Sequence, residues 1–224
     1  MSDVMKTPVK VKICGITRPE DARVAEEAGT DAIGLIFAER SRRLVTVDQA
    51  KEISKAVGIF TKRVGVFLDA PLEQVLQIAN ELRLDAVQLH GDESNDYVAR
   101  VAQHFHVIKS VAIDGEVDRG GLEQIPAHAL LIEGVIPGSG DVFDWSKAAT
   151  LKGMPNLILA GGLTPDNVVA GIKALQPYAV DVASGVEKTI TTDTQNSMGT
   201  NPATSYPTKD AAKVLDFVRA AKAY

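Results

Sequence analysis

Short apolar runs alternate with amphipathic stretches along the whole chain of 224 residues. The runs are rich in Val, Ile and Leu and end in turn-forming residues, which is typical of parallel strands buried on both faces. The predicted strands are Val9–Cys14, Ala32–Phe37, Arg63–Leu68, Ala86–His90, His106–Ala112, Ala129–Glu133, Asn156–Ala160 and Ala179–Ala183. They recur about every 20–30 residues, the repeat of βα units. This pattern predicts an α/β protein with a closed (β/α)8 TIM barrel, and a doubly wound open sheet is the main alternative.

Helical patterns lie between these strands. Capping boxes or proline-containing starts are predicted at Thr17-Arg18-Pro19-Glu20, Thr46-Val47-Asp48-Gln49 and Thr164-Pro165. Further helices are predicted at Pro71–Leu82, Glu93–Gln103 and Lys209–Ala221, with weaker patterns at Asp118–Gln124 and Trp145–Leu151. The helices therefore alternate with the strands, as a barrel requires.

Composition indicates one domain spanning residues 1–224. Hydrophobic residues make up 45% of the chain, enough for one core, and no shift in composition marks a second domain. A polar insertion, Lys188–Thr208, follows the eighth predicted strand and is rich in Thr, Ser and Asn. A loop of this length is usually functional or mobile. Because Tyr206 is its lone aromatic anchor, we expect a mobile loop that is dispensable for substrate binding.

The overall charge excludes several classes of partner. A net charge of -5 provides no basic field for nucleic acid or anionic lipid, so any bound phosphate must be held by local geometry. The single cysteine, Cys14, excludes an intramolecular disulfide and a multi-cysteine zinc site. Met1–Thr7 does not resemble a secretory signal, and no apolar run reaches the roughly 18 residues of a membrane span. We therefore expect a cytoplasmic protein.

Candidate functional residues gather at the predicted carboxyl ends of strands, where barrel enzymes place their active sites. These residues are Cys14, Arg42, Arg43, Glu133, Gly161, Gly162, Ser184 and Gly185. The two pairs that contain glycine lie in the loops after strands seven and eight. Backbone amides there often bind phosphate, although two ordinary tight turns would look the same.

Each polar candidate has a structural alternative. Cys14 is either a buried hydrophobe or a base or nucleophile. Glu133 lies in an apolar run, which favours either a protonated general acid or a salt bridge to a loop cation. Asp181 faces either the barrel mouth or a helix, and His90, which shares a face with Gln88, is a structural histidine or a catalyst.

Arg42 and Arg43 lie in the predicted loop after the second strand. A guanidinium matches a carboxylate or a phosphate, because its donors form a planar fork with a permanent charge. Consecutive loop arginines are often merely solvated, and we expect one of the two to be so.

Taken together, several motifs resemble those of the phosphoribosylanthranilate isomerase family. In chain order they are Lys12-Ile13-Cys14-Gly15-Ile16-Thr17, Val64-Gly65-Val66-Phe67, Val87-Gln88-Leu89-His90-Gly91, Gly138-Ser139-Gly140, Phe143-Asp144-Trp145, Leu159-Ala160-Gly161-Gly162-Leu163 and Val180-Asp181-Val182-Ala183-Ser184-Gly185-Val186-Glu187. They cover essentially the whole chain. The resemblance implies an Amadori rearrangement in tryptophan biosynthesis, which converts N-(5-phosphoribosyl)anthranilate into 1-(2-carboxyphenylamino)-1-deoxyribulose 5-phosphate.

The resemblance also implies roles for individual residues. Cys14 matches the general base, and Arg43 matches the arginine that holds the anthranilate carboxylate. Asp181 matches the polar residue near the reacting sugar. The residues that match the phosphate loops are Gly161, Gly162, Ser184 and Gly185. We add His90 as a substrate-binding residue. We expect a small phosphorylated substrate, no metal or redox cofactor, and a monomer or homodimer.

Two departures from the family pattern bear on mechanism. Glu133 occupies the position of the family's acidic aspartate, so its carboxyl is displaced by one methylene, and the loop before Gly138 is shortened. The insertion Lys188–Thr208 replaces a much shorter connection. We predict that Glu133 acts as the acid. The alternatives are a related sugar-phosphate isomerase, which the two-aspartate pattern of the histidine-pathway enzyme makes less suitable, and a phosphate-binding barrel that has lost catalysis.

Overall fold

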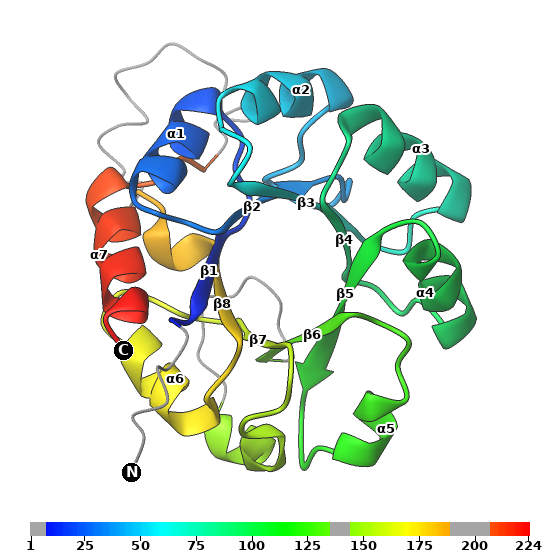
Figure 1. Ribbon diagram of the computed structural model, residues 1–224, viewed down its shortest axis with the longest axis vertical. Coiled ribbons are helices and arrows are strands. Elements are labelled where there is room, and N and C mark those ends of the chain that lie inside the picture. The colour runs from blue at the N-terminus through cyan, green and yellow to red at the C-terminus, as the bar shows by residue number, and fades with distance from the viewer. Residues whose placement is uncertain (1–7, 135–143, 189–206) are drawn as a thin grey trace.

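The computed structural model describes residues 8–134, 144–188 and 207–224, and within them the strands form a closed parallel barrel (Figure 1). Each strand pairs with the next, and the last pairs with the first. The strands are β1 (Lys10–Ile13), β2 (Ala32–Ile36), β3 (Lys62–Phe67), β4 (Ala86–Leu89), β5 (His106–Ile113), β6 (Ala129–Gly134), β7 (Leu157–Leu159) and β8 (Ala179–Val182). The predicted (β/α)8 barrel is confirmed, and the open sheet is excluded by the β1–β8 pairing.

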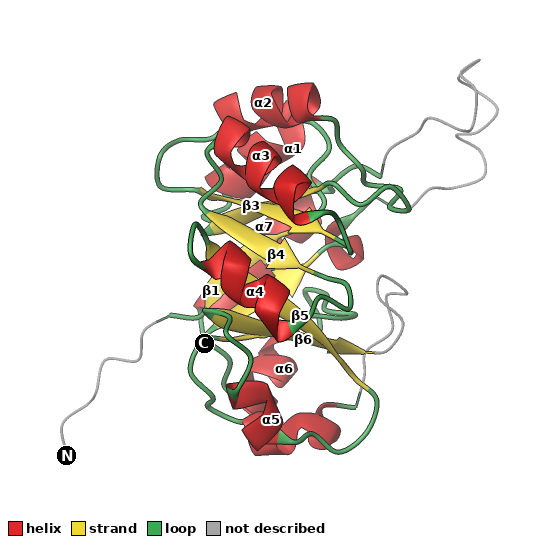
Figure 2. Cartoon of the chain, turned by 90° about the vertical axis from the view of Figure 1, so that its right-hand side faces the viewer, coloured by secondary structure: helices red, strands yellow, loops and turns green. Residues whose placement is uncertain are grey.

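Helices surround the strands as an outer ring (Figures 1 and 2). They are α1 (Pro19–Glu27), α2 (Val47–Lys55), α3 (Leu72–Leu82), α4 (Asn95–Ala102), α5 (Arg119–Glu123), α6 (Val168–Leu175) and α7 (Ala211–Lys222), with 3-10 turns η1 (Trp145–Leu151) and η2 (Ser184–Val186). None of these described helices has both the length and the apolar character needed to cross a membrane. The weakly predicted segments are the shortest helix, α5, and the 3-10 turn η1.

Two apolar layers result from the alternation of side chains along each strand. The outward layer packs against the helices and includes Val11 and Ile13 of β1. A smaller inner cluster contains Leu131 and Ile158, both inside the barrel. Lys12, between Val11 and Ile13, therefore points into the interior. The inner face of the barrel thus carries both an apolar cluster and polar side chains.

The predicted capping box at the start of α1 is wrong. The N-cap is Arg18 and makes no side-chain cap, while the Thr17 hydroxyl donates to the carbonyl of Pro207 at 3.3 Å. Glu20 therefore has no capping partner in Thr17. Because Pro19 occupies the first turn and has no N–H to satisfy, the helix begins without a cap. By contrast, the box predicted at Thr46 and Gln49 is confirmed in both directions, at 3.1 and 2.8 Å.

The helix predicted to start at Thr164-Pro165 begins later, at Val168. The preceding residues form a turn that Asn167 holds together. Its side-chain oxygen accepts from the Thr164 amide at 2.8 Å, and its nitrogen donates to the Gly162 carbonyl at 2.9 Å. This side chain supports the loop after β7 instead of capping a longer helix.

Most of the predicted insertion, residues 189–206, lies outside the described residues, as does the motif Gly138-Ser139-Gly140. The two ends of the insertion contact each other. The Lys188 amide donates to the Thr208 carbonyl at 3.0 Å, and Glu187 and Lys209 form an antiparallel bridge. The two ends therefore meet, as at the base of a hairpin.

Candidate active site

A cavity of about 460 Å³ opens at the carboxyl ends of the strands, a size usual for a small-molecule site. The predicted residues among its lining are Cys14, Arg43, His90, Glu133, Gly161, Gly162, Asp181 and Ser184. Gly185 is not part of this lining and packs against Leu163 instead. Residues from distant parts of the sequence thus meet in one pocket, as the strand-end rule requires.

On one side of the pocket, Cys14 follows β1 and is 6% exposed. Two residues earlier on the same strand, the buried Lys12 ammonium lies 2.9 Å from an Asp181 carboxylate oxygen, across the β1–β8 pairing that sets these residues opposite each other. Asp181 therefore faces the barrel interior and not a helix. Burial raises the pKa of the Cys14 thiol, and the nearby Lys12 charge opposes part of that rise.

On the opposite side, the Glu133 carboxylate lies 2.7 Å from Nε2 of His90. His90 Nδ1 is 3.1 Å from the Gln88 amide nitrogen and 3.0 Å from the Ser110 hydroxyl. Because an amide nitrogen only donates, Nδ1 accepts from it, so the ring proton sits on Nε2 and is donated to Glu133. In the described part of the chain, no lysine or arginine lies within ion-pair distance of Glu133, so the salt bridge to a loop cation is ruled out there.

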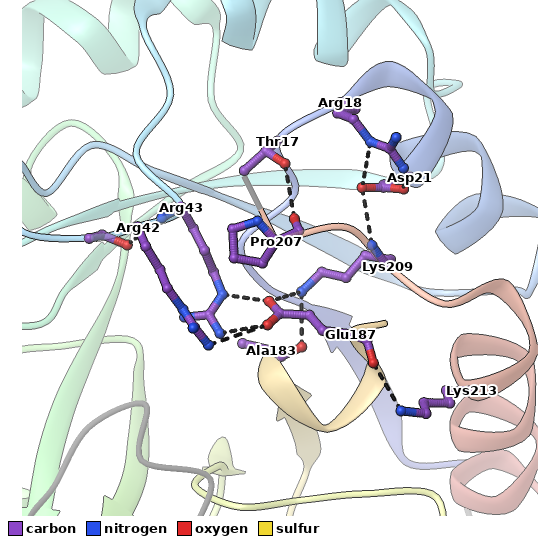
Figure 3. A network of polar contacts seen from close by, with 11 residues as sticks. Thr17, Arg18, Asp21, Arg42, Arg43, Ala183, Glu187, Pro207, Lys209 and Lys213 are labelled. Carbon is purple, nitrogen blue, oxygen red and sulfur yellow. Dashed lines mark hydrogen bonds and ion pairs between the residues drawn. The ribbon is translucent and has the colours of Figure 1, made fainter. Parts of the chain in front are cut away.

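Arg43 is held by a carboxylate that sequence reasoning did not single out (Figure 3). Its Nε and Nη2 donate to the two oxygens of Glu187 at 2.6 and 3.0 Å. The buried Lys209 ammonium lies 3.2 Å from the same carboxylate, and the more exposed Arg42 lies at 3.7 Å. Burial would raise the pKa of Glu187, but Arg43 and Lys209 outweigh it and lower that pKa.

The segment around Lys209 is tied to several elements of the barrel (Figure 3). Its amide donates to Asp21 of α1 at 3.2 Å, and its ammonium donates to the Ala183 carbonyl at 2.9 Å. Lys213 of α7 donates to the Glu187 carbonyl at 2.9 Å. The chain around Lys209 is therefore anchored beside the pocket.

The loops after β7 and β8 approach each other closely. Gly161 has a φ of +80°, a conformation that favours glycine, and any Cβ on Gly185 would lie 1.9 Å from the Leu163 carbonyl oxygen. Both positions therefore need glycine for packing as well as for any contact with a ligand. The described lining carries three arginines, Arg40, Arg42 and Arg43, against the carboxylates Glu133 and Asp181. This pocket is locally basic in an acidic chain.

Sequence reasoning missed Lys12, Ser110, Glu187 and Lys209 as parts of the site. A signal existed for Lys12, since it lies two residues before Cys14 on the same strand and so shares its face. For the pairing of Glu187 with Arg43, 144 residues away, no local signal existed. Among the described residues, no group of three or more histidine, cysteine, aspartate or glutamate side chains is arranged as metal ligands.

The chain is similar to known proteins along most of its barrel. Residues 11–196 match the family described as N-(5'-phosphoribosyl)anthranilate (PRA) isomerase. The N-(5'-phosphoribosyl)anthranilate isomerase of Rubrobacter xylanophilus is 45% identical over 185 residues, covering 80% of this chain and 90% of that protein. The crystal structure of phosphoribosyl anthranilate isomerase from Thermus thermophilus is 39% identical, with a TM-score of 0.82, covering 95% of this chain and 98% of that one.

A second solved structure, phosphoribosyl anthranilate isomerase in complex with reduced 1-(o-carboxyphenylamino)-1-deoxyribulose 5-phosphate, is 34% identical to this chain. Its TM-score is 0.79, and the match covers 96% of this chain and 100% of that one. The similarity therefore extends over the whole barrel and includes a relative with a phosphorylated ligand.

Proposed function

Because this chain belongs to the N-(5'-phosphoribosyl)anthranilate isomerase family, an enzyme family of tryptophan biosynthesis, we propose that its pocket catalyses the Amadori rearrangement with Cys14 as base and Glu133 as acid. The acid donates a proton to the ring oxygen of the aminoaldose, and the sugar opens to an iminium. The base then removes the C2 proton to give an enolamine, which ketonises to the product. The iminium itself acidifies C2.

The observation that carries this assignment is the placement of the two groups on opposite walls of one pocket. Cys14 follows β1, and Glu133 lies on β6, with the cavity between them. A ring opening and a proton abstraction on one sugar require an acid and a base that act from different sides. Both side chains are buried, so water competes little with the substrate for either group.

His90 supports the acid in this scheme. Its Nε2 proton is donated to one oxygen of Glu133, so the transferable proton of the acid resides on the other oxygen. Gln88 and Ser110 fix the ring from its far side. This arrangement compensates for the extra methylene of glutamate, because a hydrogen bond at 2.7 Å holds the longer side chain in one rotamer.

Arg43 retains donors for the anthranilate carboxylate. Glu187 occupies Nε and one hydrogen of Nη2, the side of the guanidinium fork. A guanidinium has five N–H groups, so the end formed by Nη1 and Nη2 is left for a second carboxylate. Arg43 lines the pocket, and its end-on donors are suited to a bidentate contact there.

The phosphate is assigned to the loops after β7 and β8. Gly161 and Gly162 lie in the left-handed region at the cavity, with φ values of +80° and +63°, and Ser184 begins the turn η2 beside them. Backbone amides in such turns form concave anion sites. Gly185 contributes by allowing the two loops to pack, not through the lining.

The experiment is steady-state turnover of freshly generated phosphoribosylanthranilate by wild-type protein and by Cys14→Ala. We expect wild-type turnover and a loss of about 10³-fold or more in the variant, within the range for removal of a general base. Binding of a non-reacting product analogue by the variant serves as the control for folding. A folded wild type without turnover, or a variant with full turnover, would contradict the assignment.

We expect the protein to act in the cytoplasm as a monomer or homodimer on this small phosphorylated substrate. Light scattering at micromolar concentration distinguishes the two assembly states, and cell fractionation tests the location. Neither nucleic acid nor anionic lipid is expected to bind, given the net charge of -5.

A further inference from the structure

We propose that Lys12 is a positioning residue of the reaction, because its buried ammonium, fixed by Asp181, lies on the strand face that carries Cys14 and supports the negative charge of the thiolate. The inference rests on the proposed function of Cys14 as base and adds the group that makes this base usable. Lys12 acts through Cys14 and is not assigned a contact with substrate.

The Lys12 ammonium is buried and held in place by an ion pair. Its side chain is 5% exposed, that of Asp181 is 8% exposed, and their charged atoms are 2.9 Å apart. The β1–β8 register places Lys12 opposite Asp181, and Cys14, two positions after Lys12 and directly after β1, shares its face. A buried lysine in a barrel interior is costly to desolvate, and one carboxylate does not use all three of its N–H donors. The Cys14 sulfur is a second hydrogen-bond partner of the Lys12 ammonium beside Asp181.

The charges that face the thiol have opposing effects. Burial raises the pKa of Cys14, Lys12 lowers it, Asp181 raises it and the more distant Lys209 lowers it. The neighbouring strand β2 contributes Gly34, which carries no charge. Lys12 itself stays protonated: burial would lower its pKa, but Asp181 and Cys14 outweigh burial and raise it. The two members of the ion pair therefore shift the pKa of the Cys14 thiol in opposite directions.

The proton balance of the base step explains why this charge is needed. The thiolate takes the C2 proton and becomes a neutral thiol, while the electron pair of the C–H bond moves into the enolamine and neutralises the iminium. Before this step the site must hold a thiolate in a buried position, and a fixed ammonium stabilises it more strongly there than in water. After it, the neutral thiol leaves Lys12 paired with Asp181.

The test compares two variants of one ion pair. Because Cys14 is the single cysteine of the chain, the ultraviolet absorbance of its thiolate, measured against Cys14→Ala, reports its titration without ambiguity. We expect Lys12→Met to raise the pKa of Cys14 and Asp181→Asn to lower it, since the two charges act in opposite directions. A purely structural disturbance would move both variants the same way or neither.

Activity provides the second readout. Lys12→Met is expected to lower kcat at neutral pH about 100-fold with little change in KM, and Lys12→Arg is expected to restore most of the loss by restoring the charge. The matched control is Lys10→Met, on the same strand, whose ammonium pairs with Asp31 at 3.0 Å on the exposed side. That variant should change neither the thiol titration nor kcat.

The proposal is overturned if Lys12→Met leaves the thiol titration unchanged, or if Lys10→Met shifts it equally. If Lys12→Met does not fold, the double variant Lys12→Met/Asp181→Asn leaves no unpaired charge, and its thiol pKa should lie above that of Asp181→Asn alone. A double variant that titrates like Asp181→Asn alone would refute a contribution from Lys12. Normal turnover by Cys14→Ala would instead refute the proposed base, whatever the titrations show.

Discussion

The two walls of the pocket differ in the interactions that surround their titratable groups. On the β4–β6 wall, Glu133 meets His90, whose ring is held by Gln88 and Ser110. On the β1–β8 wall, Cys14 lies beside a buried ion pair. The wall of the proposed acid, the acid wall, thus orients a carboxyl through hydrogen bonds, and the wall of the proposed base, the base wall, places charges beside a thiol.

This difference follows from what each proposed group must do. A general acid has to hold a proton, so a lysine beside Glu133 would favour the wrong form. A thiol acting as a base has to lose its proton in a buried place, so it needs a cation nearby. The positive charges accordingly cluster on the base wall and its continuation, where Arg43 and Lys209 surround Glu187.

The strongest test of the acid wall is Glu133→Gln, which keeps the shape and removes the transferable proton. We expect kcat to fall about 10²–10⁴-fold, the usual contribution of a general acid or base. Steady-state kinetics measure this loss, and unchanged affinity for a product analogue provides the control. Full turnover in Glu133→Gln would show that this wall does not supply the acid.

The continuation of the base wall, here called the charged wall, consists of Arg43, Glu187 and Lys209. It is tested by Glu187→Gln, which leaves Arg43 and Lys209 without their carboxylate. Breaking a buried charge cluster in this way should lower the free energy of unfolding by about 3 kcal/mol at neutral pH. Urea titration measures this loss. The control is Glu123→Gln, which removes a half-exposed partner of Arg119 and should cost about 0.5 kcal/mol or less.

The stability difference between wild type and Glu187→Gln should depend on pH in a defined direction. The pKa of Glu187 is lowered from its ordinary value of 4.5, so its ionised form stabilises the folded chain at pH values above that value. The contribution is lost as the pH falls through the lowered folded-state pKa. Wild type and Glu187→Gln should therefore differ fully at neutral pH and converge in acid. A difference that grows in acid would contradict the charged character of this wall.

A smaller effect is expected from His90→Asn on the acid wall. The shorter side chain does not reach Glu133, so kcat should fall about 10- to 100-fold through misplacement of the carboxyl, with KM nearly unchanged. His90→Gln, which keeps a donor of greater reach, should recover part of the loss. A rise in KM with constant kcat would instead assign His90 to substrate binding.

The smallest effect is expected from replacing residues 190–206 by a short glycine-serine link. Lys188 and Thr208 already meet through a backbone hydrogen bond of 3.0 Å, and Lys209 is anchored by Asp21. Stability should change by about 1 kcal/mol or less, since closure entropy varies slowly with loop length. A collapse of substrate affinity, measured as KM, would show that the insertion serves the charged wall.

Much of this protein was determined by local sequence. Short apolar runs and their recurring spacing predicted every barrel strand, because each strand is buried on both faces. The strand-end rule then collected Cys14, Arg43 and Glu133 in one pocket. Helix starts were less predictable, since Thr17 is drawn away from its helix by Pro207, which only the closed fold brings near.

Tertiary structure alone decided which partner each functional group received. The sequence placed Glu133 in an apolar strand, but the His90 ring beside it comes from the residue directly after β4. It placed Arg43 in a loop, but the Glu187 carboxylate that orients it arrives 144 residues later, after β8. The burial of a strand follows from its own apolar side chains. The charges and hydrogen bonds at a site come from contacts that exist only once the barrel has closed.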